Sequence, residues 1–186
     1  MNMDFDELVE TRRSVRNFKS TKPDWRTILE AIDLTRFAPM AGNQFTPRFI
    51  LVDDLDKIKK IAEASEQDFI EQAHYVIVMC SNKKLTVNAY GDRGQNYVKQ
   101  QTGAAIQNFL LKLNEFGLST CWVGHFYDEK IKHLLKIPEE IDIEALFPIG
   151  YALEKPKKKR KIDFDTIMFF NEYKNKKMKI PKKINA

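Results

Sequence analysis

The sequence lacks several features that mark whole classes of proteins. No apolar run approaches the roughly 18–20 residues that cross a bilayer, and residues 1–7 are acidic, without the basic and apolar regions of a secretory leader. The G-x-S-x-G motif of hydrolases, the P-loop and the G-x-G-x-x-G dinucleotide motif do not occur. We therefore expect a cytoplasmic protein without a membrane span. Hydrolase, P-loop kinase and Rossmann dehydrogenase functions lose support.

Cysteine and histidine are also scarce. Cys80 and Cys121 are the two cysteines, and both lie inside apolar runs, which favours buried thiols in a reducing compartment over a disulfide. The three histidines, His74, His125 and His133, do not have the spacing of metal ligands. We expect no metal site.

Charge is present but unevenly placed. Residues 1–154 contain 19 basic and 23 acidic residues, a net charge of −4, whereas residues 155–186 contain 12 basic and 3 acidic residues, a net charge of +9. A nucleic-acid-binding domain usually spreads basic charge over a folded face. The terminal location of the charge therefore makes nucleic-acid binding a remote alternative, and we expect no nucleic-acid partner.

Apolar periodicity predicts a mixture of helices and strands. Helices are expected over residues 4–11, 24–37, 54–72 (in two segments), 98–116 and 128–135, and strands over residues 48–53, 75–80, 120–124 and 145–151. The polar residues 81–96 are expected to form a loop, and Pro148 suggests an edge strand or a bulge. With no repeat and no interdomain linker, the pattern indicates one α+β or α/β domain.

One cluster of charged residues could hold an anion. Residues 12–18 read Arg-Arg-Ser-Val-Arg-Asn-Phe. If this segment is extended, Arg12, Ser14 and Arg16 point to the same side, and two guanidiniums with a hydroxyl can seat a phosphate dianion. A solvated basic loop is the alternative, and the local sequence does not decide between them.

Four stretches, taken in order, carry a family resemblance. They are Arg12-Arg13-Ser14-Val15-Arg16-Asn17-Phe18, Ala38-Pro39-Met40-Ala41-Gly42-Asn43-Gln44, the pair Gly103–Leu111 and Gly117–Gly124, and Ile149-Gly150-Tyr151 followed by a basic run after Pro156. In this order and spacing they resemble the nitroreductase family of flavoproteins over roughly residues 4–167. The resemblance implies an α+β, three-layer fold with a central mixed, mainly antiparallel sheet flanked by helices. It also implies a homodimer with FMN at the subunit interface.

The resemblance assigns binding roles to specific positions. The FMN phosphate and ribityl chain would be held by Arg12, Arg13, Ser14 and Arg16; the flavin-facing loop would be Pro39, Met40, Ala41 and Asn43; and Trp122, Val123 and Gly124 would lie along the isoalloxazine. Lys159 and Lys161, or Arg160 if the alignment slips by one residue, would form a second phosphate clamp. Residues 1–167 would form the FMN-binding domain. The apolar residues of the basic tail, 168–186, would pack on the partner subunit.

The implied function is a ping-pong oxidoreductase. NADH or NADPH would supply hydride to FMN, and a small planar acceptor such as a nitroaromatic or quinone would then be reduced; no side chain is assigned as a catalytic acid. Tyr90, Arg93 and Tyr97 are candidates for contacting the substrate. The sequence departs from the family pattern at Gln101, where an acidic residue is common. A protein of the same fold without NAD(P)H reductase activity, of the flavin-storage, flavin-fragmenting or dehalogenating type, is the alternative.

Overall fold

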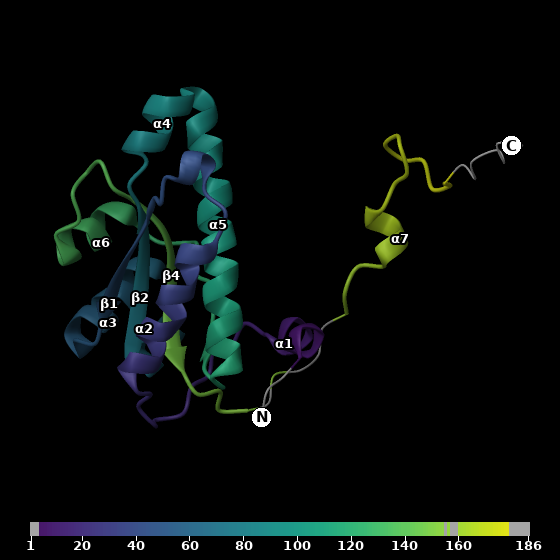
Figure 1. Ribbon diagram of the computed structural model, residues 1–186. Coiled ribbons are helices and arrows are strands. Elements are labelled where there is room, and N and C mark those ends of the chain that lie inside the picture. Colours follow the sequence, from purple (N-terminus) through teal and green to yellow (C-terminus); the bar gives the residue numbers. More distant parts are fainter. Residues whose placement is uncertain (1–3, 155, 157–159, 179–186) are drawn as a thin grey trace, which may run out of the picture. The chain divides into compact units, whose positions relative to one another are not determined.

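The computed structural model describes residues 4–154, 156 and 160–178 (Figure 1). The chain forms two compact units, residues 1–156 and 157–186. The first unit is built on a four-stranded sheet of order β1-β2-β4-β3. Its strands are β1 (Pro47–Val52), β2 (Tyr75–Ser81), β3 (Ser119–Thr120) and β4 (Asp142–Gly150).

Helices connect and cover these strands. They are α1 (Phe5–Thr11), α2 (Trp25–Asp33), α3 (Leu55–Ser65), α4 (Lys84–Tyr90), α5 (Asp92–Glu115), α6 (Asp128–Leu135) and α7 (Phe164–Ile167), with 3-10 turns η1 (Leu34–Phe37), η2 (Ala41–Asn43) and η3 (Asp68–Gln72). Asp24 and Asp54 cap α2 and α3 with their side chains, as expected of N-caps. Gly117, after α5, has the expected left-handed φ of 71°.

The sheet is covered by helices on both faces, which confirms the three-layer α+β fold (Figure 1). Side chains of β2 alternate between two cores: Ile77 and Met79 belong to the core that includes α2 and α5, and Val76 and Val78 to the core that includes α3 and α6. All three strand pairings are antiparallel. The described sheet is therefore antiparallel and not mixed, and Ser14 forms an isolated parallel bridge with Thr120 outside the strands.

The expected edge or bulge at Pro148 is wrong. β4 lies between β2 and β3, and the register shift in its pairing with β2 is at Met79 and Cys80. On its other side, β4 pairs with β3 as far as Thr120, and Val123 then forms a bridge with β4. Pro148 lies between these two pairings and has no N–H to donate. The proline therefore interrupts the hydrogen bonding on the β3 side of β4, although β4 is inside the sheet.

The expected loop over residues 81–96 is also wrong. This segment contains α4 and the start of α5, which begins at Asp92. A Cβ on Gly94 would lie 2.6 Å from the Thr86 carbonyl oxygen and 2.7 Å from the Val87 Cα. The two helices therefore pack backbone to backbone at this corner, a contact that hydrophobic periodicity does not register.

Both cysteines are buried, as expected, and they are not joined in a disulfide. Among the described residues, no helix combines the length and the apolar character needed to cross a bilayer.

The second unit contains α7 and an irregular segment. Lys176 Nζ donates to the carbonyl oxygens of Asp165 and, at 3.0 Å, Met168, and it lies 3.9 Å from the centroid of the Phe169 ring. Ile167 and Tyr173 are exposed. The compact units divide after Pro156, whereas the sequence placed the boundary after residue 167. Packing of the tail on a partner subunit stays a prediction.

Candidate functional site

The arginine-rich segment is extended and lies beside β3. The Val15 N–H donates to the Thr120 carbonyl oxygen at 3.0 Å, and Ser14 forms the parallel bridge with Thr120. Val15 is buried, whereas its neighbours Ser14 and Arg16 are exposed. The alternation expected for an extended segment is therefore present, with a hydroxyl and a guanidinium on the outer side.

The three guanidiniums have different surroundings. Arg13 turns back and donates to the carbonyl oxygens of Glu10 and Arg12, the latter at 2.8 Å, so it caps the end of α1. The Arg16 guanidinium lies 5.8 Å from the centroid of the Phe69 ring. Within the described residues, none of the three arginines forms an ion pair with a carboxylate. Their positive charge is therefore not neutralised by the part of the fold that is described.

Helix α5 supports this segment through a residue that the sequence did not single out. Asn114 Nδ2 donates to the Leu8 carbonyl oxygen and to Thr11 Oγ1, both at 3.0 Å. These bonds fix the end of α1, where the arginine segment begins. A small cavity of about 90 Å³ lies at this junction and is lined in part by Arg12, Asn114 and Thr120.

The expected flavin-facing loop is held by the other half of α5. Residues 39–46 include the 3-10 turn η2, in which Gly42 and Asn43 have left-handed φ values of 56° and 55°. The buried side chain of Gln101 bonds to three residues of this loop, and its Oε1 accepts from the Ala41 N–H at 2.9 Å. Gln101 is a polar residue on the buried face of a helix, a signal that could have marked it from the sequence.

An open pocket of about 360 Å³ lies between the loop and α5. It is lined by Pro39, Met40, Ala41, Tyr97, Gln100, Gln101 and Ala104. Tyr97 packs edge-on against Tyr90, with ring centroids 5.3 Å apart and planes at 80°. Two of the three substrate candidates are thus close to the loop, whereas Arg93 is exposed and not among the residues lining this pocket.

The stretch from Trp122 to Gly124 continues the line of β3. Val123 exchanges two backbone hydrogen bonds of 3.0 Å with Leu146, which holds the stretch against β4. The Trp122 ring lies 5.9 Å from the Phe147 ring and remains 45% exposed. The partly exposed Trp122 ring therefore lies beside a backbone segment that is held by hydrogen bonds.

The structure brings together only some of the expected site residues. The arginine segment adjoins β3 at Thr120, and Trp122–Gly124 follow β3 in the chain. The loop of residues 39–43 is instead bonded to Gln101, while the arginine segment adjoins Asn114. These two anchors are about 20 Å apart along α5 at 1.5 Å per residue. Of the second clamp, Lys159 is outside the described residues, and Arg160 and Lys161 are exposed in the second unit.

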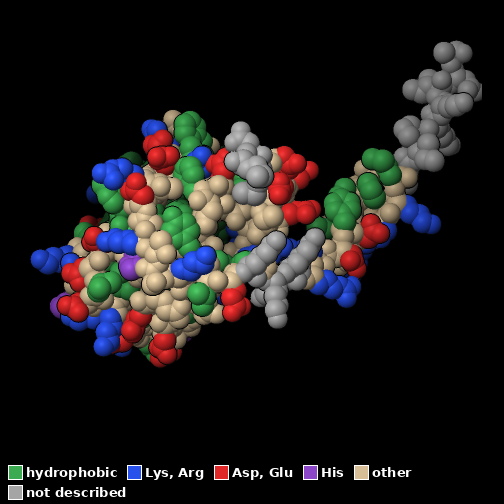
Figure 2. All heavy atoms as spheres, turned by 90° about the horizontal axis from the view of Figure 1, so that it is seen from below, with side chains coloured by type: hydrophobic (Ala, Val, Ile, Leu, Met, Phe, Trp, Pro, Cys, Tyr) green, Lys and Arg blue, Asp and Glu red, His purple; other side chains and the backbone are tan. Residues whose placement is uncertain are grey.

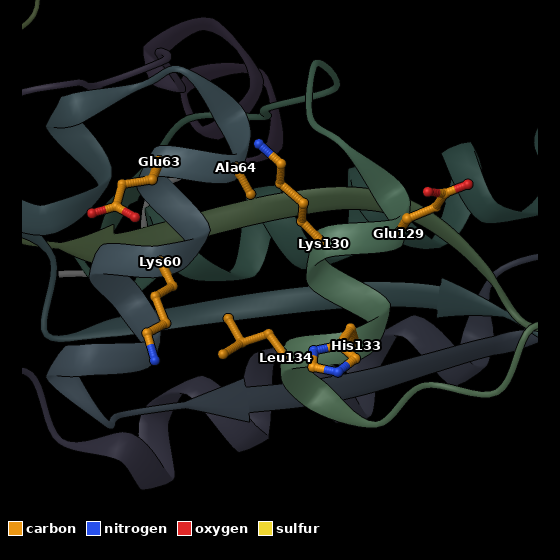
Figure 3. A pocket seen from close by; sticks show the side chains of 7 residues that line it. All are labelled: Lys60, Glu63, Ala64, Glu129, Lys130, His133 and Leu134. Atoms are coloured by element: carbon orange, nitrogen blue, oxygen red, sulfur yellow. The ribbon is translucent and has the colours of Figure 1, made fainter.

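A larger groove of about 640 Å³ lies between α3 and α6 and contains none of the expected site residues. Figure 3 shows its lining residues, Lys60, Glu63, Ala64, Glu129, Lys130, His133 and Leu134. Their side chains point in different directions and do not converge on one point (Figure 3). The groove is therefore large enough for a small molecule, but it lacks the convergent polar groups of a small-molecule site.

The family model of the nitroreductase family matches residues 9–67 and 63–151, which is most of the chain. The chain belongs to the nitroreductase family. This confirms the resemblance seen in the sequence, and it places the chain among oxidoreductases at the level of the family. A relative in Archaeoglobus fulgidus, with the provisional name NADH dehydrogenase/NAD(P)H nitroreductase, is 29% identical over 80% of this chain and 86% of its own length.

The chain is also similar to a relative with a different named activity and to a solved structure. An iodotyrosine deiodinase of Thermotoga neapolitana is 25% identical over 86% of this chain and 93% of its own length. The solved structure of an FMN-dependent nitroreductase from Clostridium difficile superposes with a TM-score of 0.77 over 89% of this chain and 98% of that one, at 22% identity. At that identity the superposition establishes the fold alone.

Proposed function

We propose that this protein is an FMN-dependent oxidoreductase that takes hydride from NADH or NADPH and reduces a small planar acceptor such as a nitroaromatic or a quinone. The observation that carries the proposal is the extended segment containing Arg12, Ser14 and Arg16. It is fixed beside β3 by the Val15 hydrogen bond, and its guanidiniums have no carboxylate partner within the described residues.

The residues present fit a flavin mononucleotide in charge and in layout. The phosphate is close to a dianion, and arginine and serine are suited to hold one. From Thr120, beside the arginine segment, to Gly124 the chain extends about 13 Å at 3.3 Å per residue, and the half-exposed Trp122 lies on the way. Bound FMN would supply the hydride chemistry, while these residues bind the phosphate and orient the ring.

The same geometry supports a homodimer as part of the proposal. The flavin-facing loop lies about 20 Å along α5 from the arginine segment, so we propose that the loop of one subunit completes the site of the other. Large apolar side chains are exposed on the helices near these two segments. They are Phe5, Val9, Trp25, Leu29, Leu34 and Phe37. Exposed apolar groups of this number are typical of an interface, and this surface would supply the dimer contact.

The proposal is tested by the colour and the turnover of the purified protein. Oxidised FMN gives absorption bands near about 370 and 450 nm. Protein carrying FMN should then oxidise NADH or NADPH in the presence of a quinone, with parallel lines in double-reciprocal plots as expected of a ping-pong cycle. A colourless protein that does not take up added FMN would overturn the cofactor assignment. An FMN-bound protein that turns over neither nucleotide would overturn the reductase assignment alone.

A dehalogenating flavoprotein is the second candidate, favoured by the similarity to the T. neapolitana iodotyrosine deiodinase over most of both chains. The two functions separate by substrate. A dehalogenase reduced chemically with dithionite should release iodide from iodotyrosine in a single turnover, whereas a quinone or nitro reductase should not.

A nucleic-acid function of the basic tail remains the remote alternative. On the face of the first unit shown in Figure 2, basic and acidic side chains are interspersed. This distribution does not resemble the continuous basic stripe of a nucleic-acid-binding face. It supports assigning the function to the flavin site instead.

A further inference from the structure

The side chain of Gln101 bonds to three separate residues of the loop over positions 39–46. Its Oε1 accepts from the Ala41 N–H at 2.9 Å, and its Nε2 donates to Thr46 Oγ1 at 2.7 Å and to the Gln44 carbonyl oxygen at 3.3 Å. Gln101 is 4% exposed. Hydrogen bonds at a buried position are costly to leave unmade, so the loop and the helix are fixed to each other at this point.

The loop needs such support because its own conformation is unfavourable. Gly42 and Asn43 are consecutive residues in the left-handed region, and Asn43 adopts it without the freedom of glycine. Local bonds are limited to those of the turn, from the Asn43 N–H to Met40 and from the Gln44 N–H to Ala41. The first turn of the loop therefore depends on contacts from outside.

A second contact closes the loop from the other side. A Cβ on Gly42 would lie 2.8 Å from Tyr90 Oη, so a larger residue there would have to displace the Tyr90 side chain at the end of α4. The loop is thus held between Gln101 on α5 and Tyr90 on α4. Both helices belong to the corner that includes the Gly94 contact.

The hydrogen-bond partners of residue 101 match an amide side chain. An amide accepts with its oxygen and donates with its nitrogen, which matches one N–H donor at Ala41 and two oxygen acceptors at Gln44 and Thr46. A carboxylate can only accept, so it would face the Gln44 carbonyl oxygen without a proton between them. A protonated carboxyl could again both accept and donate.

We propose that Gln101 is the positioning residue that sets the flavin-facing loop: by fixing Ala41 and Gln44 on either side of Gly42 and Asn43, its amide holds the loop's contact with the flavin ring in place. This inference rests on the proposed function and adds to it a residue that acts through the loop. Gln101 also lines the open pocket beside Met40, so the same contact sets one wall of the space open to an acceptor. Tyr97 is the one titratable side chain among the residues that line this pocket.

The test is the pH dependence of flavin binding in Q101E. At low pH the protonated carboxyl can accept from the Ala41 N–H and the Thr46 hydroxyl and donate its one proton to the Gln44 carbonyl oxygen, so FMN should bind within about twofold of wild type. At high pH the carboxylate has no proton to donate to the Gln44 carbonyl oxygen, and the dissociation constant should rise about tenfold. Because the loop faces the ring, riboflavin affinity should fall by the same factor as FMN affinity. Fluorescence titration from pH 5 to pH 9 measures both.

Gln107 provides a matched control, because it is an exposed glutamine on the same helix. Q107E changes the charge of α5 equally and should follow the wild-type pH profile. Q101E with a profile parallel to wild type and Q107E would overturn the inference, as would a loss that is equal at every pH. A wild-type protein that binds no FMN would overturn the proposed function and this inference with it, whereas wild-type binding with an unaffected Q101E overturns the inference alone.

Discussion

Arg12 tests the phosphate site at the scale of a single residue. Its guanidinium is half-buried beside the small cavity near β3 and forms no ion pair with a carboxylate in the described parts of the chain. A charged hydrogen bond contributes about 1.5–3 kcal/mol, so R12A should weaken FMN binding roughly 10- to 100-fold. R16A should act in the same direction. Riboflavin, which lacks the phosphate, should bind R12A and wild type about equally.

Arg26 serves as the control for this substitution. It is exposed and paired with Asp24 at 3.4 Å, so R26A should retain wild-type FMN affinity. R12A and R16A proteins that stay fully yellow after dialysis would show that the cluster is only a solvated surface.

The buried thiol of Cys80 predicts the direction in which protein stability changes at alkaline pH. Burial, and next the charge of Glu144, raise the pKa of this thiol from 9.0 to about 11. Between these two values the unfolded thiol ionises while the folded one stays protonated, so the unfolded state binds fewer protons and stability falls as pH rises through this window. Below pH 9.0 the thiol contributes no pH dependence.

Urea unfolding at pH 8 and at pH 10.5 measures the effect by comparison with C80A. The free energy of unfolding should fall more steeply with pH in wild type than in C80A, because the other groups that ionise in this range are common to both. Equal slopes would mean that Cys80 ionises as readily in the folded protein as in the unfolded chain.

At the scale of elements, the corner between α4 and α5 depends on Gly94. An added Cβ would meet backbone atoms of α4 at 2.6 and 2.7 Å, and backbone has less freedom to move aside than a flexible side chain. G94A should therefore destabilise the protein by about 1–3 kcal/mol, measured by urea unfolding.

Gly103 lies on the same helix and has no atom within 4 Å of its Cβ position. G103A should stabilise the apoprotein by about 0.5–1 kcal/mol, because alanine favours the helix. A G94A protein that is as stable as wild type, or stabilised as G103A is expected to be, would contradict the tight packing of α4 on α5.

The same corner shows which elements a sequence reveals. The continuous apolar run Tyr75–Cys80 predicted β2, and the apolar residues from Val98 onward predicted α5 from Val98 to its end. The start of α5, residues 92–97, was missed because its buried face begins there with Gly94, which has no apolar side chain. A periodicity search registers apolar side chains, whereas this face is buried by close backbone contact and by hydrogen bonds.

At the scale of the molecule, the tail tests the predicted dimer. Deleting residues 168–186 removes Tyr173 and Met178, which are 81% and 70% exposed, together with much of the terminal positive charge. If the tail packs on the partner subunit, the shortened chain should lose the dimer in light scattering and much of its FMN. Loss of RNA binding with FMN and dimer intact would instead favour the nucleic-acid alternative.

The sequence by itself determined the family, the caps of the helices, most strands and the arginine segment, because these depend on local preference, alternation or residue type in order. Tertiary structure decided three things that no local pattern contains: β4 in the interior of the sheet despite Pro148, the helices over residues 84–97, and the bonds from Gln101 to the loop over residues 39–46. In each case the contact is made by backbone or by a polar side chain, which hydrophobic periodicity does not register. It also decided the separation of the two halves of the expected site along α5, which is the physical reason for proposing that two copies of the chain complete it.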